Sequence, residues 1–137
     1  MRYAFFENRR NEFLLVARIL MVILFVWSGW GKLTNFSGAV GAMAGAGLPI
    51  PTVAAIVAIA IEFFAGIAVA IGFLTRPLAL LMAVFTLAAA FIAHHYWTMT
   101  GPEHIGNMIN FYKNISIVGG FLFLCITGAG RYSIDRE

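Results

Sequence analysis

A single acidic residue, Glu62, lies halfway along the apolar stretch 51–74 of this sequence. At ~1.5 Å per residue, a helix over that stretch is ~36 Å long, enough to cross the ~30 Å hydrocarbon core of a membrane. A carboxylate near the bilayer centre costs ~3 kcal/mol on insertion scales, so Glu62 is expected to face protein or water rather than lipid. Two roles are therefore predicted for Glu62. It either accepts protons in a ligand site or a proton path, or it forms a buried ion pair that fixes the helix register.

Other polar residues fall on one face of each neighbouring apolar stretch. Arg18 and Lys32 share a face of the first stretch by helical spacing, and His94 follows a row of small residues along the third. Lys113 shares a face with small and weakly polar residues of the fourth. Their positions along the helices place Lys32, His94 and Lys113 in the outer third of the membrane, Glu62 in the middle and Arg18 toward the inner side. At these depths Glu62 can pair with Arg18 or Lys113.

These residue types predict proton transfer beside a polarised ligand. Glu62 and His94 are the candidate catalytic residues because both side chains exchange protons. Lys32, Lys113, Asn114 and Arg18 are the candidate ligand-binding residues. Each has a structural alternative: a hydrogen-bonded belt histidine for His94, a headgroup anchor for Lys113 and a snorkelling side chain for Arg18.

Composition narrows the class of protein. Of 137 residues, 61% are hydrophobic and only 11% charged, against about 25% charged in an average soluble domain. The net charge of +3 comes without the basic cluster and interleaved aromatics of a nucleic-acid surface, so nucleic acid is not an expected partner. The single cysteine permits no internal disulfide, and no Cys/His spacing predicts a metal site. A haem between two histidines is disfavoured, because His94 and His95 are adjacent and diverge.

The apolar stretches predict one all-α membrane domain over residues 1–137, a bundle of four transmembrane helices. Their expected bounds are about 13–31, 51–74, 77–97 and 109–130. Residues 33–50 are too glycine-rich to span and predict a short interfacial helix, whereas 98–110 predict a polar loop. The positive-inside rule makes both termini cytoplasmic. The arginines on that side are Arg2, Arg9, Arg10, Arg76, Arg131 and Arg136.

Several short motifs occur in a familiar order along the chain. They are Ser28-Gly-Trp-Gly-Lys32, Glu62 with Gly66, Gly72-Phe-Leu-Thr-Arg76, His94-His95-Tyr-Trp97, Lys113-Asn114 and Ile126-Thr-Gly-Ala-Gly-Arg-Tyr-Ser-Ile-Asp135. Together they resemble the DoxX family of small bacterial inner-membrane proteins over nearly the whole length. Gly128-Ala129-Gly130 stands where the family usually has Gly-Pro-Gly, a minor departure.

This resemblance implies a four-helix, multi-pass protein of the bacterial inner membrane. The family is named after a subunit associated with thiosulfate:quinone oxidoreduction, and distant relatives act in assembly or trafficking. We therefore expect a subunit that binds a quinone or other lipophilic ligand for a redox protein, which supplies the electrons. A non-enzymatic assembly or scaffold protein is the alternative, and a small-solute carrier ranks last. Membrane lipids are expected partners, and a homo-oligomer is an open alternative.

Overall fold

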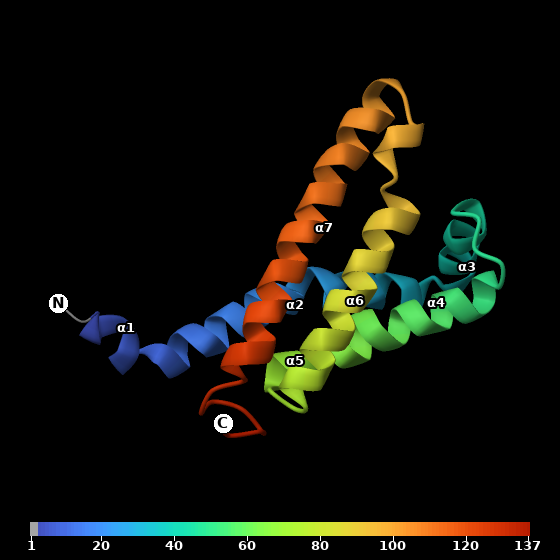
Figure 1. Ribbon diagram of the computed structural model, residues 1–137. Helices are drawn as coiled ribbons and strands as arrows, with labels where there is room; N and C mark the ends of the chain where they lie inside the picture. The colour runs from blue at the N-terminus through green and yellow to red at the C-terminus, as the bar shows by residue number, and fades with distance from the viewer. Residues whose placement is uncertain (1–2) are drawn as a thin grey trace.

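Four long helical runs frame the molecule, as Figure 1 shows for the computed structural model, which describes residues 3–137. The first is α2 (Arg10–Thr34), and the second joins α4 (Pro51–Ile59), the π-helical segment η1 (Ala60–Ala65) and α5 (Gly66–Ile71). The third and fourth are α6 (Thr75–Ala93) and α7 (Gly101–Thr127). All four runs are long and apolar enough to cross a membrane, so the four predicted spans are confirmed.

The runs form two arms that separate toward one end (Figure 1). One arm comprises residues 10–71, in which α3 (Phe36–Gly45) lies beside α4; the other is the antiparallel hairpin of α6 and α7. The core lies where the arms join, in the half of the molecule near the C-terminus. Its buried residues are Val22, Phe25, Val69, Ala79, Met82, Ala83, Phe121 and Leu124. The opposite half is therefore open between the arms.

One glycine permits the tightest helix crossing within the first arm. A Cβ built on Gly29 of α2 would lie 2.6 Å from the backbone nitrogen of Phe63 in η1, closer than side-chain atoms approach. The missing side chain lets α2 lie directly against η1. This crossing is adjacent to Glu62, so it sets how closely α2 approaches that carboxyl.

The segment η1 interrupts an otherwise α-helical span with a π-helix, which includes Glu62. A hydrophobicity pattern predicts one uninterrupted helix over 51–74 and cannot reveal the change of hydrogen-bond register. Single π-helical turns are rare within α-helices and are frequent at functional sites. The direction in which Glu62 points is therefore set by the π-helical register.

The predicted loop 98–110 was wrong over most of its length, because α7 begins at Gly101. Pro102 fits the first turn, where a missing backbone N–H is tolerated. The same helix ends at Thr127, before Gly128, whose φ of 72° leaves the helical region. The short helix predicted within residues 33–50 is confirmed as α3, which Asn35 caps by accepting from the Gly38 N–H at 3.2 Å. Its place in the membrane interface stays a prediction.

The segment that follows α7, residues 128–137, folds back against the turn between α5 and α6. Backbone N–H groups of Ile134 and Asp135 donate to the carbonyls of Ile71 and Gly72 at 3.2 and 2.8 Å. We call residues 128–137 the C-terminal tail. The side of the membrane on which it lies stays a prediction, and Arg2 lies outside the described residues.

Candidate functional site

A cavity of about 570 Å³ lies between the two arms, on the open side of the core. Its walls are mostly apolar, and both arms contribute polar groups. Five of the six candidate site residues line it, namely Lys32, Glu62, His94, Lys113 and Asn114. Three further polar side chains, Ser28, Thr86 and Asn110, complete the lining. We call this space the inter-arm cavity.

Glu62 is almost buried and forms an ion pair with Lys32 at 2.7 Å between Oε2 and Nζ. The Lys32 ammonium also donates to Ser28 Oγ at 2.7 Å, and Ser28 Oγ lies 3.5 Å from the carboxylate. Ser28 and Lys32 are one turn apart on α2, on either side of the Gly29 crossing. The three side chains form a compact polar cluster at one wall of the inter-arm cavity.

The predicted pairing of Glu62 with Arg18 or Lys113 was wrong. Depth along the membrane normal was the basis of that prediction, and it carries no information on which helices cross. The absent side chain of Gly29 brings the end of α2 onto η1, so Lys32 reaches Glu62 first. Arg18 lies near the C-terminal tail, and Lys113 lies on the other arm.

The opposite wall of the inter-arm cavity carries a second polar group. His94, which ends α6, lies with Nδ1 2.9 Å from Asn107 Oδ1 of α7. With the amide oxygen as acceptor, Nδ1 carries the proton and Nε2 is the basic nitrogen. Lys113 donates to Asn110 Oδ1 at 3.1 Å, and Asn114 lies one turn beyond Asn110 on the same helix. This wall therefore offers one base and several hydrogen-bond donors.

Arg18 does not line the inter-arm cavity. Its side chain is 1% exposed and donates to three backbone carbonyls: Ala70 at 3.0 Å, Tyr132 at 2.7 Å, and Ala129. Every nitrogen of the guanidinium thereby binds the backbone, Nε that of α5 and the two Nη atoms that of the C-terminal tail. The structure thus separates Arg18 from the other five candidates and places it among groups that hold the fold together.

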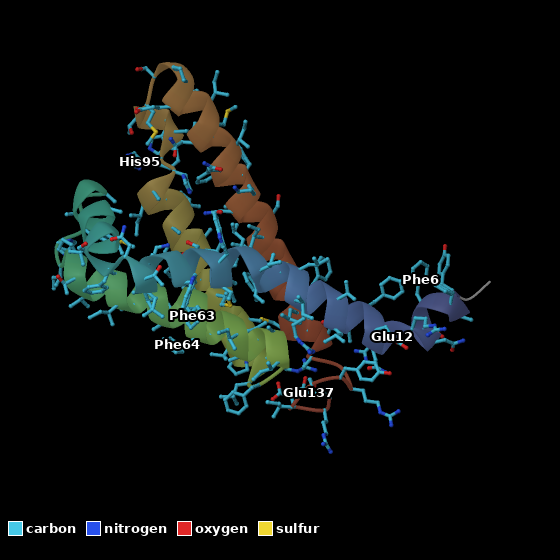
Figure 2. All side chains as sticks on the ribbon, turned by 180° about the vertical axis from the view of Figure 1, so that it is seen from behind. Phe6, Glu12, Phe63, Phe64, His95 and Glu137 are labelled. Carbon is cyan, nitrogen blue, oxygen red and sulfur yellow. The ribbon has the colours of Figure 1, made fainter. Side chains whose placement is uncertain are left out.

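His95 and His104 also lie apart from the cavity lining. Figure 2 shows His95 at the far end of the α6–α7 hairpin, remote from Glu137 in the C-terminal tail. His95 Nδ1 contacts the Ile92 carbonyl oxygen at 2.9 Å, and His104 Nδ1 contacts that of Tyr96 at 2.8 Å. Both rings are thus bound to the backbone of the hairpin end.

Sequence reasoning missed Asn110 as a cavity residue. Residue 110 fell at the edge of the predicted loop, although Asn110 and Asn114 are separated by four positions, the spacing of one helix face. Thr86 lay on the same predicted face as His94, and it does line the cavity. The Thr86 hydroxyl donates to the Met82 carbonyl at 2.6 Å, so its hydrogen-bond donor is already used within α6.

Four apolar spans, with a mostly apolar cavity between them that carries a few polar groups, define a small polytopic helical membrane protein. The chain belongs to the DoxX family, whose model, described as DoxX, matches residues 13–95. It is 49% identical over 137 residues to the inner membrane protein YphA of Escherichia coli K12, covering all of this chain and 98% of YphA. It is 48% identical to the inner membrane protein YqjF of the same organism, covering 89% and 88% of the two chains.

A more distant similarity extends to a eukaryotic protein. The Surfeit locus protein 4 homolog of Schizosaccharomyces pombe is 28% identical over 133 residues, which cover 96% of this chain and 39% of that protein. No solved structure matches the chain. With four spans and two relatives named as inner membrane proteins, this is a multi-pass inner-membrane protein.

Proposed function

We propose that the protein binds a quinone or a related lipophile in the inter-arm cavity and presents it to a redox protein of the membrane. One observation carries the proposal: Lys32, Glu62, His94, Lys113 and Asn114, from both arms, line a single cavity with mostly apolar walls. Small-molecule sites combine an apolar lining with a few polar groups that orient the ligand.

The size and walls of the cavity fit a lipophile. About 570 Å³ lies within the range of ~300–1,000 Å³ for ligand pockets. The apolar wall includes Leu24, Phe25 and Val57 from one arm and Phe85 and Ile92 from the other. A ring with a short length of isoprenoid chain would displace no bound polar partner from these surfaces.

The polar groups divide into two chemical roles. The Lys113 ammonium and the Asn114 amide are donors suited to the carbonyl oxygens of a quinone ring. Reduction of a quinone to a quinol takes two electrons, which the redox protein supplies, and two protons. Glu62 and His94 line the same cavity. Each would first take up a proton from water and then pass it to one of the two ring oxygens. Lys32, bound to Glu62, would hold the carboxylate in place.

The test is to purify the protein in a mild detergent, record its absorption spectrum, and extract it for mass spectrometry of bound small molecules. The expected result is a quinone at about one per chain in the wild type and little in Glu62→Gln. Glu103→Gln is the matched control, because Glu103 is exposed at the start of α7 and outside the cavity lining. Undiminished quinone in a folded Glu62→Gln variant would overturn the proposal. Only phospholipid in the proportions of the bulk membrane, with no lipophile enriched in the wild type, would favour an assembly or scaffold role instead.

A further inference from the structure

The formal charges that line the inter-arm cavity do not cancel. Its three ionisable carboxylate or ammonium groups are Lys32, Glu62 and Lys113. Lys32 and Glu62 neutralise one another at 2.7 Å. The Lys113 ammonium instead donates to the neutral amide of Asn110 at 3.1 Å, and the ion pairs formed within residues 3–137 involve other cations. The lining therefore carries one positive charge in excess.

An ammonium at the wall of an apolar cavity has unmet bonding capacity. It carries three N–H donors, and one is used by Asn110. Lys113 is itself exposed, and beside the apolar wall its charge attracts an opposite charge more strongly than it would in bulk water. Asn114 and His94 lie on the same lining and offer further polar contacts around Lys113.

We infer that the inter-arm cavity prefers a lipophile with an anionic headgroup, a carboxylate or phosphate, which binds Lys113 while its chain lies along the apolar wall. The inference rests on the proposed function in one respect, that the cavity holds a lipophile, and it adds the charge of the headgroup. A neutral quinone binds the same cavity more weakly. A hydrogen bond to a charged group contributes ~1.5–3 kcal/mol, so the expected preference for the anion is about ten- to a hundredfold.

Trp27 provides the readout, because it lines the cavity. The chain has three tryptophans, and Trp30→Phe/Trp97→Phe leaves Trp27 as the only one. The probe is dibrominated stearic acid, which quenches the fluorescence of a tryptophan that it touches, and its methyl ester is the uncharged control. Both are measured in an uncharged detergent at mildly alkaline pH, where the acid is ionised. We expect the acid to quench Trp27 at least about tenfold more tightly than the ester.

Substitution of Lys113 isolates the charge. Lys113→Met is expected to lower the affinity for the acid to that for the ester and to leave the ester unchanged, whereas Lys113→Arg keeps the preference. Arg131→Met is the control for general cationic attraction, because Arg131 is exposed in the C-terminal tail. Native mass spectrometry of the wild-type protein with the same two lipids repeats the comparison without tryptophan substitutions.

The outcomes separate this inference from the proposed function. Equal affinity for acid and ester, or a preference that survives Lys113→Met, overturns the inference and leaves a neutral lipophile in the cavity. Quenching by neither lipid overturns the proposed function as well. Competition by palmitate and hexadecyl phosphate but not by hexadecanol supports the inference, and the stronger competitor identifies the headgroup. Equal competition by hexadecanol overturns it.

Discussion

The C-terminal tail and the inter-arm cavity use cations in opposite ways. Around the tail, two arginine side chains bind backbone carbonyls: Arg18 binds those of Ala70, Ala129 and Tyr132, and Arg76 binds those of Cys125 and Ile126. In the cavity, Lys113 binds one neutral amide, and Lys32 binds a carboxylate and a hydroxyl. A cation that is saturated by the backbone stabilises the fold, whereas one with spare donors at a cavity wall is available to a ligand.

Arg18→Met is expected to have the largest effect on stability. It leaves three carbonyls without their charged donor, and at ~1.5–3 kcal/mol for each such hydrogen bond the expected loss is about 5 kcal/mol. The measurement is the free energy of unfolding in detergent, with proteolysis of the tail as a second readout. Arg131→Met, on an exposed side chain, should remain within about 0.5 kcal/mol of the wild type. A loss in Arg18→Met no larger than in this control would contradict the structural role.

Glu62→Leu should destabilise the protein by about 3 kcal/mol, because it leaves the Lys32 ammonium without its counter-charge. The double variant Lys32→Met/Glu62→Leu should regain most of that stability, because both charges are removed together. A double variant that is stable but has lost the bound lipophile would sharpen the contrast between the cavity and the tail. The ion pair would then serve ligand binding rather than stability. If the double variant is stable and still binds lipophile, the ion pair has no part in the site.

Gly29→Ala should cost about 2 kcal/mol and also weaken ligand binding. Its Cβ would meet the backbone of Phe63, so α2 must move away from η1 and carry Lys32 from Glu62. Gly31→Ala is the matched control on the same helix, since nothing lies within 4 Å of its Cβ. Chemical denaturation and ligand extraction on both variants measure the two effects. Equal losses of stability and of ligand in Gly29→Ala and Gly31→Ala would show that the close crossing of α2 and η1 is not their cause.

Asp135→Asn is expected to have the smallest effect, about 1 kcal/mol at neutral pH, typical of a lost helix cap. The Asp135 carboxylate accepts from the N–H groups of Leu74 and Thr75 at 2.9 and 2.8 Å, at the start of α6. Partial burial acts to raise the pKa of Asp135, but these N–H donors and the charge of Arg18 outweigh it and lower the pKa. A lowered pKa in the folded state stabilises the protein above the unfolded value of about 3.9, and this stability is lost as the pH falls through the folded value.

The unfolding free energies of wild type and Asp135→Asn should therefore differ near neutral pH and converge in acid. Hydrogen exchange at the Leu74 and Thr75 amides reports the same change locally. A difference that does not depend on pH would show that the carboxylate charge is irrelevant. Leu74 makes this a sensitive position, because its φ of 47° lies in the left-handed region that is strained for a leucine.

The four spans were predictable because hydropathy and length decide them without reference to packing. The gathering of His94 and Lys113 was also accessible, since helical spacing places each on an inward face. The partner of Glu62 was not, because it depends on a close crossing at Gly29 and on the π-helical register of η1, and neither leaves a periodic signal. The start of α7 was missed because the polar residues of 98–110, such as Glu103 and His104, were interpreted as a loop.

The hydrogen bonds of Arg18 also bear on how the protein is made. Arg18 belongs to the span that is synthesised before the other three, whereas Ala129 and Tyr132 are synthesised after all four. Until then the guanidinium of the inserted first helix lacks two of its three carbonyl partners and must be kept solvated by water, lipid headgroups or the insertion machinery. Synthesis of the segment after α7, rather than insertion of any one helix, thus supplies the last hydrogen-bond partners of this arginine.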